Sequence, residues 1–312
     1  MSAFDLQVNG YGGVDFNQDD LGAEDLQRAC ELLEAHGAGG ILATIITEHP
    51  DRMESRIRRL RELRETVPLA RRIIAGIHIE GPFLNPADGY RGAHPLDAIK
   101  GGTVSLMDRL VEAGGGLVRL VTLAPEMDAS HKVVRCLISR NIAVSAGHTD
   151  ASLNQLRGAI DAGLTLFTHL GNGCPALLPR HDNIIQRALS LRQDLWLCFI
   201  CDGVHIPFDV LRNYLDLIGP EGKAIATTDA MSAAGLGPGR RRLGRWEVEV
   251  GADYAARSPD GSHLVGSAIP IPQLKNNLET KLRLNVQAVR RLTESHPRQA
   301  LGLGSPIDFG SS

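Results

Sequence analysis

The sequence has little net charge, no long apolar run and no leader-like beginning. Its 312 residues include 33 Lys and Arg against 36 Asp and Glu, which gives a formal charge of -3, and the pI is near 6.4. A chain so close to neutral has no broad electrostatic attraction to nucleic acid or to an anionic membrane, so we expect a compact, specific ligand instead. No apolar stretch approaches the length that spans a bilayer, and residues 1–5 lack both the basic and the apolar part of a signal peptide. These absences predict a cytoplasmic protein.

Cysteine is scarce and irregularly spaced. Five scattered cysteines predict reduced thiols and argue against a disulfide framework. Cys198 and Cys201 have the spacing of a redox or zinc pair, but they belong to an apolar run that is typical of a buried strand. Residues three apart on a strand face opposite sides, so we expect both to pack in the core.

Short apolar runs alternate with amphipathic stretches through most of the chain, and 43% of the residues are hydrophobic. This alternation is typical of βα units around a parallel sheet, and the length suits a single barrel. We therefore predict an α/β fold with one (β/α)8 TIM-type barrel, forming a single domain over residues 1–312. The eight candidate strands are residues 4–8, 41–46, 73–80, 117–123, 142–148, 164–169, 195–202 and 223–229.

Two further segments carry alternative interpretations. The helix expected around residues 54–65 has five arginines that alternate with glutamates around a narrow apolar stripe, which favours a solvated helix face over a nucleic-acid patch. The glycine-rich stretch 235–239 lacks the Lys-Ser/Thr ending of a P-loop, so we expect a mobile loop or lid there.

Polar side chains follow several predicted strands where each strand ends, which is where barrel enzymes place their active sites. Glu80, His148, His169 and Asp229 all occupy such positions. Two imidazoles and one carboxylate form a known catalytic zinc arrangement, because this ligand set leaves the metal positive and one position open. Glu80, His148 and His169 would supply that set.

Two neighbouring residues remain ambiguous on sequence alone. His78 precedes Glu80 by two positions, so both side chains point to the same side of a strand, and we expect His78 to pack beside a ligand. Asp202 fits a metal ligand, a capping group or a loop anchor equally well.

Eight short motifs occur in order along the chain: residues 5–10 (DLQVNG), 78–83 (HIEGPF), 92–94 (GAH), 147–149 (GHT), 168–172 (THLGN), 202–205 (DGVH), 228–230 (TDA) and 264–267 (LVGS). Each motif alone is weakly diagnostic, but the ordered series is specific. On these residues the chain resembles the N-acetylglucosamine-6-phosphate deacetylases of the amidohydrolase superfamily. The likeness covers nearly the whole sequence and implies a metal-dependent amidohydrolase barrel domain.

The resemblance implies a role for the residue at each matching position. Glu80, His148 and His169 are the implied metal ligands, Asp229 is the general base, and His94 helps to polarise the acetyl carbonyl. The implied substrate-binding residues are His94, Asn172, Gly173, Arg180, His205, Leu264, Val265 and Gly266. In the family the arginine that matches Arg180 reaches the site of the neighbouring subunit, so the resemblance also implies a homodimer.

The chain departs from the superfamily pattern at three places. Two-metal members carry a His-x-His pair at the end of the first strand, where this chain has Gln7 and Asn9. Carboxamides are poor ligands for zinc-like ions, so we expect one divalent ion per chain, with zinc ahead of iron, cobalt or manganese. Gly171 and Gly173 stand where larger residues are common, and we expect a looser substrate loop with an altered sugar preference. Because the first strand begins almost at the first residue and the chain stops soon after its last helix, we also expect the family's small β-sandwich to be absent.

Together these observations predict the hydrolytic deacetylation of an N-acetylated amino sugar 6-phosphate, with N-acetylglucosamine 6-phosphate giving glucosamine 6-phosphate and acetate. Two alternatives stay open. One is a sister amidohydrolase that acts on another N-acetyl sugar phosphate or on a cyclic amide. The other is a sugar-phosphate-binding protein with weak catalysis, although binding alone does not need a base such as Asp229.

Overall fold

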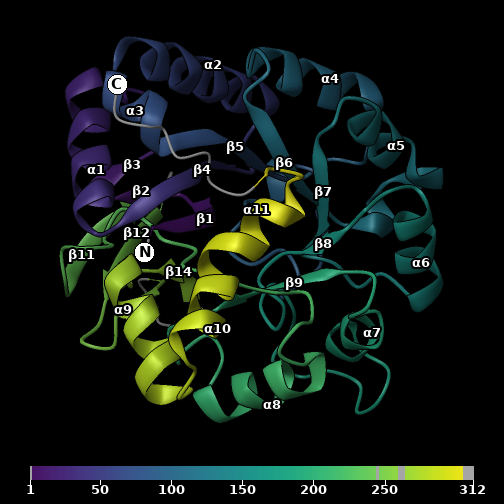
Figure 1. The fold of residues 1–312 in the computed structure, drawn as a ribbon. Helices are drawn as coiled ribbons and strands as arrows, with labels where there is room; N and C mark the ends of the chain where they lie inside the picture. The colour runs from purple at the N-terminus through teal and green to yellow at the C-terminus, as the bar shows by residue number, and fades with distance from the viewer. Residues whose placement is uncertain (1, 244–245, 259–263, 305–312) are drawn as a thin grey trace.

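The computed structural model describes residues 2–243, 246–258 and 264–304. Its main sheet contains eight parallel strands, paired in chain order, which curl into a nearly closed barrel with helices around the outside (Figure 1). Every predicted strand coincides with one of these eight, so the sheet expected for a (β/α)8 barrel is confirmed. The strands are β1 (Ala3–Val8), β4 (Ala38–Ile46), β5 (Ile74–Glu80), β6 (Val118–Leu123), β7 (Ala143–Ala146), β8 (Leu166–Phe167), β9 (Trp196–Ile200) and β10 (Ala224–Thr227).

The helices cover the barrel with their apolar faces. In the first helix Leu26, Ala29 and Leu33 are buried, as the predicted spacing requires. The longer helices are α1 (Ala23–Ala35), α2 (Pro50–Thr66), α4 (Val104–Ala113), α5 (Lys132–Ser139), α6 (Leu153–Asp161), α7 (Ile184–Ser190) and α8 (Phe208–Ile218). Shorter helices are α3 (Pro68–Ile73), α9 (Ile271–Asn276), α10 (Val286–Arg290) and α11 (His296–Ala300).

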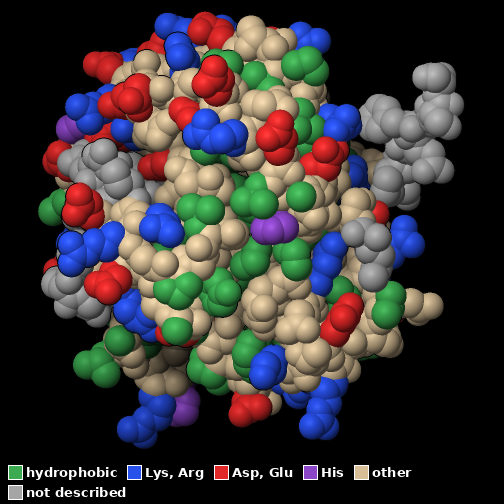
Figure 2. Space-filling view, turned by 90° about the vertical axis from the view of Figure 1, so that its left-hand side faces the viewer, with side chains coloured by type: hydrophobic (Ala, Val, Ile, Leu, Met, Phe, Trp, Pro, Cys, Tyr) green, Lys and Arg blue, Asp and Glu red, His purple; other side chains and the backbone are tan. Residues whose placement is uncertain are grey.

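The arginines of α2 form ion pairs and cap backbone groups. Arg56 Nε lies 2.7 Å from Asp19 Oδ1, Arg58 pairs with Glu54 four residues earlier, and Arg64 Nε donates to the carbonyl of Ile74. On the face shown in Figure 2, positive and negative side chains are interspersed over the upper part. The solvated helix face that the sequence favoured is confirmed, because arginines such as Arg58 and Arg59 are exposed while the apolar stripe of α2 is buried.

Cys198 of β9 and Cys201, the residue directly after β9, pack in different parts of the core. Cys198 belongs to an inner cluster with Phe4, Leu42 and Ile225, whereas Cys201 packs in the outer core. Both thiols are buried, and burial raises the pKa of each. Packing in the core is thus confirmed for this pair. Among the described residues, no helix is both long and apolar enough to cross a membrane.

One end of the barrel is filled by apolar side chains. Ala300 of α11 belongs to the inner cluster, and Leu301 and Leu303 pack against it. The Arg298 guanidinium lies 4.6 Å from the centre of the Phe4 ring, and in Figure 1 α11 crosses the centre of the view. Because this amino-terminal end of the strands is occupied, polar chemistry is confined to the opposite, carboxyl end.

A second, antiparallel sheet follows β10. It consists of β11 (Gly239–Leu243), β12 (Trp246–Val250), β13 (Ala255–Arg257) and β14 (Leu264–Ser267), and a small hairpin joins β2 (Gly10–Tyr11) to β3 (Val14–Asp15). The surface loop expected at residues 235–239 is confirmed for residues 235–238, which form a partly exposed turn, and β11 begins at Gly239. The prediction from sequence did not include this sheet, although residues 246–250 (WEVEV) alternate apolar and charged side chains as a strand does. β14 joins the barrel through a parallel bridge between Ser267 and Ala230.

The seam between the first and last barrel strands is closed by a buried carboxylate. Asp5 Oδ1 accepts hydrogen bonds from Thr227 Oγ1 at 2.6 Å and from the Gln7 backbone at 3.2 Å. Its Oδ2 accepts from Thr228 Oγ1 at 2.6 Å and from the Thr228 backbone at 3.1 Å. Burial raises the pKa of Asp5, and these hydrogen bonds oppose that rise. β1 and β10 form no ladder with each other, and the backbone bridge at this seam joins Val8 to Ala230. The carboxylate therefore supplements a short stretch of backbone pairing.

We expect Asp5→Ala to lower the free energy of unfolding by roughly 2 to 4 kcal/mol, because it leaves several buried donors without an acceptor. Urea unfolding followed by circular dichroism measures the change. Asp20→Ala, at an exposed position, should shift stability by less than about 0.5 kcal/mol. Equal stabilities for the two variants would show that the seam does not depend on Asp5.

Candidate active site

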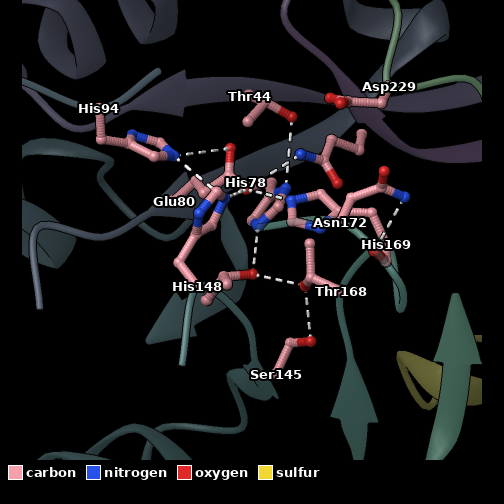
Figure 3. Close-up of polar contacts among 12 residues, drawn as sticks. Thr44, His78, Glu80, His94, Ser145, His148, Thr168, His169, Asn172 and Asp229 are labelled. Atoms are coloured by element: carbon pink, nitrogen blue, oxygen red, sulfur yellow. Dashed lines mark hydrogen bonds and ion pairs between the residues drawn. The ribbon is translucent and has the colours of Figure 1, made fainter. Parts of the chain in front are cut away.

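The predicted polar residues meet at the carboxyl end of the barrel (Figure 3). Glu80 is the last residue of β5, and His148, His169 and Asp229 follow β7, β8 and β10 within two residues. These three have left-handed backbones, with φ of 51°, 32° and 49° respectively. Non-glycine residues rarely adopt this conformation, and it concentrates at functional sites because the surrounding structure must hold it. Here it turns each side chain out of the strand and over the barrel mouth.

Three donor atoms lie close enough to share one cation. His169 Nε2 lies 3.0 Å and His148 Nε2 lies 3.3 Å from Glu80 Oε1, and one ligand atom from each residue lies within 4.8 Å of the others. In a tetrahedral site with bonds of about 2.0 to 2.2 Å, ligand atoms stand roughly 3.3 Å apart. The spacing and the donor types therefore fit a divalent metal ion.

The protonation of His148 strengthens this fit. Its Nδ1 lies 2.7 Å from the carbonyl oxygen of Tyr90, which only accepts, so Nδ1 donates. In the neutral ring Nε2 then carries a lone pair that faces the Glu80 carboxylate. Two electron-rich atoms in contact are stabilised by a cation between them, and a hydrogen bond from the far ring nitrogen is the usual support of a histidine ligand.

Electrostatics keep the central carboxylate ionised. Burial raises the pKa of Glu80, but in the metal-free protein the contacts with His148, His169 and the nearby His94 outweigh burial, so this pKa lies well below its ordinary range. Conversely, burial lowers the pKa of His169, and contact with Glu80 overcomes this and raises it. The site thus stabilises negative charge on its carboxylate ligand.

Two carboxamide side chains, Gln7 of β1 and Asn9 just after β1, each donate a hydrogen bond to a carboxylate of the site. Gln7 Nε2 donates to Glu80 Oε1 at 3.1 Å, and Asn9 Nδ2 donates to Asp229 Oδ1 at 2.8 Å. Each amide therefore uses its donor end, which cannot bind a metal.

Asp229 lies in a setting that suits a base. Burial raises its pKa to about 7, while His169 and His205 lower it and Glu80 raises it further. A carboxyl group that titrates near neutral pH can both accept and return a proton. His94 differs, because burial and neighbouring His148 lower its pKa to about 3. His94 is thus a neutral imidazole, with Nε2 3.2 Å from His148 Nε2.

His78 lies beneath the site in a chain of hydrogen-bonded side chains. Its Nδ1 lies 3.3 Å from Thr44 Oγ1 and its Nε2 lies 2.8 Å from Thr122 Oγ1, and from there hydroxyl contacts continue through Thr168 to Ser145 (Figure 3). Both ring nitrogens are occupied by hydroxyl groups. His78 therefore supports the layer below the ligands, as expected, and is not one of the clustered donors.

The ambiguity at Asp202 is resolved in favour of a loop anchor. Its Oδ1 accepts from the backbones of Val204 and His205 at 2.9 and 2.8 Å, and its Oδ2 lies 2.6 Å from His205 Nδ1. Although burial raises the pKa of Asp202, its contacts with His205 lower it below the ordinary value. With Nδ1 committed to Asp202, His205 presents Nε2 to the cavity.

A cavity of about 730 Å³ lies over these groups. Of the substrate-binding residues that the resemblance implies, those lining it are His94, Asn172, Gly173, His205, Leu264 and Gly266. Arg180 is exposed and does not line it, and the side chain of Val265 lies outside the described part of the structure. Sequence reasoning missed Asp88, Gly89 and Arg91, which line the cavity next to the GAH motif.

Gly173 has a steric reason to be glycine. A Cβ there would lie 2.8 Å from His148 Nδ1, and its φ is 61°. The residue is small because the loop after β8 packs against a clustered histidine. The expected looser loop is therefore not the explanation at this position. At Gly171 a Cβ would meet only ordinary contacts, but its φ of 95° is one that side chains rarely adopt.

A buried carboxylate and two histidines at a barrel mouth, with a titratable aspartate beside them, define a metal-dependent hydrolase of the amidohydrolase type. No family model matches the sequence. Human N-acetylglucosamine-6-phosphate deacetylase is 33% identical over 98% of this chain and 76% of its own length, and the Bacillus subtilis enzyme of that name is 29% identical over 96% and 74%. An Escherichia coli relative, an N-acetylgalactosamine-6-phosphate deacetylase, is 27% identical over 96% and 77%.

Solved structures agree with the sequence relatives. A mutant N-acetyl-D-glucosamine-6-phosphate deacetylase from Mycobacterium smegmatis, in complex with N-acetyl-D-glucosamine-6-phosphate, superposes with a TM-score of 0.88. It is 30% identical, and the match covers 97% of this chain and 78% of that one. The Pasteurella multocida enzyme gives a TM-score of 0.86 at 26% identity, over 99% and 79%. The chain belongs to the N-acetylglucosamine-6-phosphate deacetylase family.

The raised pKa of Asp229 generates a prediction for the metal-free protein. The folded state holds a proton on Asp229 up to about pH 7, whereas the unfolded state releases it near pH 4. Stability is therefore lost as the pH rises through this window. Asp229→Asn should raise the free energy of unfolding at pH 8 by roughly 2 to 4 kcal/mol, and the gain should vanish below about pH 4.

Urea unfolding of chelator-treated protein at pH 4 and pH 8 measures this difference. The exposed substitution Asp161→Asn should leave both values nearly unchanged. If Asp229→Asn gave the same gain at both pH values, the effect would come from packing and not from ionisation.

Proposed function

We propose that this chain hydrolyses the acetamide group of N-acetylglucosamine 6-phosphate, releasing acetate and glucosamine 6-phosphate. The observation that carries the proposal is the placement of Asp229, with a pKa near neutrality, beside the Glu80, His148 and His169 cluster. Membership of the deacetylase family supplies the substrate class. Release of amine and acetate from this sugar by the metal-loaded protein is the direct test.

We propose that Glu80, His148 and His169 hold one divalent ion, which is zinc before iron, cobalt or manganese. When bound there, such an ion would polarise the amide carbonyl and acidify water. Two neutral imidazoles and one carboxylate favour zinc among the common divalent ions. A second ion has no ligand set at β1, where Gln7 and Asn9 already donate to carboxylates.

Proton transfer falls to Asp229. As a carboxylate it takes a proton from the attacking water, and it then gives this proton to the amine nitrogen, which leaves readily only when protonated. The amide of Asn9 fixes Asp229 Oδ1, so the second oxygen is directed at the reaction. His94 is neutral because of its burial, and it can donate a hydrogen bond to the carbonyl oxygen as negative charge develops there.

Substrate orientation rests on the remaining cavity wall. We assign Asn172, the Gly173 backbone and His205 Nε2 to the phosphate, because all three residues line the cavity and Asp202 fixes the His205 ring. Arg180 would reach the substrate of a neighbouring subunit, which is why its exposure in one chain does not exclude the role and why we propose a homodimer. Leu264, Val265 and Gly266 of β14 would close the sugar side.

A second candidate differs only in the sugar. The Escherichia coli relative carries the name of the galactosamine enzyme at 27% identity, so the galacto epimer is the first alternative substrate to test. We also propose that residues 1–312 form one amidohydrolase barrel domain of a cytoplasmic enzyme. The expected absence of the family's β-sandwich stays a prediction.

One divalent ion per chain should co-purify with or rebind to the protein. Elemental analysis after dialysis measures the ratio, and His169→Ala should abolish retention because it removes one of three ligands. Gln7→Ala is the matched control, since Gln7 contacts Glu80 without being a ligand, and it should keep the ion. Two ions per chain, or unchanged metal in His169→Ala, would contradict the arrangement.

Asp229→Asn should keep the fold and the metal content while lowering kcat by at least about 100-fold, the usual scale for a lost general base. Coupled detection of free amine on N-acetylglucosamine 6-phosphate gives the rate, and elemental analysis gives the metal content. Near-native turnover at saturating substrate would make Asp229 a structural residue and would leave the reaction without its base.

A further inference from the structure

The cavity is acidic where an anionic substrate has to bind. Among the described residues that line it, Glu80, Asp88 and Asp229 carry carboxyl groups, and Arg91 is the sole Lys or Arg. Arg180 does not reach this cavity within its own chain. A phosphate that enters the site therefore meets one permanent positive charge from the same polypeptide, because histidine is only partly protonated at neutral pH.

The backbone around Arg91 is tied to the site on both sides. The carbonyl of the preceding Tyr90 accepts the proton of His148 Nδ1 at 2.7 Å. The carbonyl of Arg91 accepts from the His94 backbone at 3.0 Å, and its N–H donates to the Ala87 carbonyl at 3.1 Å. These contacts fix the backbone that carries Arg91, and a fixed backbone limits the positions that the Arg91 side chain can take.

The same loop packs against the loop that follows β8. A Cβ on Gly89 would lie 2.7 Å from Pro175 Cα, and Gly89 has a φ of 83°, so only glycine fits. Asn172 and Gly173, which we assigned to the phosphate, belong to that second loop. Arg91 is therefore carried on a segment wedged between a metal-site histidine and the phosphate wall.

The guanidinium of Arg91 is oriented by Asp88 and keeps part of its hydrogen-bonding capacity for a ligand. Its Nε and Nη2 both donate to one oxygen, Asp88 Oδ1, at 3.1 and 2.9 Å. The Asp88 side chain is 92% exposed and that of Arg91 is 32% exposed, so water screens this pair and it holds the arginine only weakly. In the described part of the chain, no hydrogen bond engages Arg91 Nη1. A planar guanidinium with a free edge matches the geometry of a phosphate.

We propose that Arg91 is a specificity-determining residue that binds the 6-phosphate group from within the same chain. This inference rests on the proposed function and deepens it. Each subunit would then supply one cation to its own substrate, whereas Arg180 would supply one to its neighbour's. Recognition of the phosphate would not depend on Arg180 alone.

The test compares Arg91→Ala and Arg91→Lys with Arg28→Ala, a matched control that also breaks an Asp–Arg pair three residues apart on the surface. Rates are measured on N-acetylglucosamine 6-phosphate and on N-acetylglucosamine. Arg91→Ala should lower kcat/KM for the phosphorylated sugar by about 10- to 150-fold, the range of a charge-assisted hydrogen bond, mostly through KM. Activity on the unphosphorylated sugar should change by less than about threefold, and Arg91→Lys should recover part of the loss because it restores charge without the fork.

A binding measurement separates this proposal from the proposed function. In the metal-loaded Asp229→Asn background, calorimetry gives the Kd of intact N-acetylglucosamine 6-phosphate with and without Arg91→Ala. Weaker binding by about 10-fold or more supports Arg91 even if the wild-type protein hydrolyses neither sugar, an outcome that would sink the proposed function alone. Equal Kd values, or equal losses of kcat/KM on both sugars, would overturn the role of Arg91.

Discussion

A single buried carboxylate organises the mouth of this barrel. Glu80 receives the Gln7 amide and both clustered histidines on Oε1, and His94 lies 3.9 Å from its other oxygen. An ionised carboxylate inside a protein is stable only when its charge is compensated. Four residues from different segments surround the charge of Glu80 here, namely Gln7, His94, His148 and His169. The need to stabilise this one charge therefore constrains how four parts of the chain pack together.

A second buried carboxylate, Asp5 at the seam between β1 and β10, also joins distant segments. Asp5 binds the backbone and hydroxyl of Thr228, the residue directly before Asp229. Asp229 has a left-handed backbone, a conformation that costs on the order of 1 kcal/mol and persists where neighbouring structure fixes it. The barrel seam thus holds in place the residue that we assign as the base, and stability and geometry of the site are joined at one contact.

The sequence predicted what depends on local pattern and failed where distant segments decide. Apolar runs bounded by polar residues located all eight barrel strands, and the strand-end rule brought Glu80, His148 and His169 to one point. The strands β11 to β14 were missed because each is only three to five residues long and lies outside the βα alternation, so that pairing with the neighbouring strand decides more than composition does. Asp202 stayed ambiguous because only the folded loop shows its bonds to His205.

Arg91 was overlooked for a similar reason. It lies three residues before His94, in a stretch without periodicity, and nothing in the letters distinguishes it from the many surface arginines. Its significance comes from what surrounds it, namely a cavity whose described lining contains three carboxyl groups and no other Lys or Arg. The importance of a charged side chain depends on the residues that surround it in the fold, and one sequence does not reveal which residues those are.

The contact between Asp5 and Thr228 joins residues that are 223 positions apart. A ribosome makes the chain from its amino end, so Glu80, His148 and His169 are all available before the last barrel strand exists. The sheet and the cluster of Glu80, His148 and His169 are therefore synthesised before the residues that close the barrel and supply Asp229. Long-range closure of this kind is the slow part of folding, so we expect the seam and Asp229 to be the last parts of the site to take their final positions.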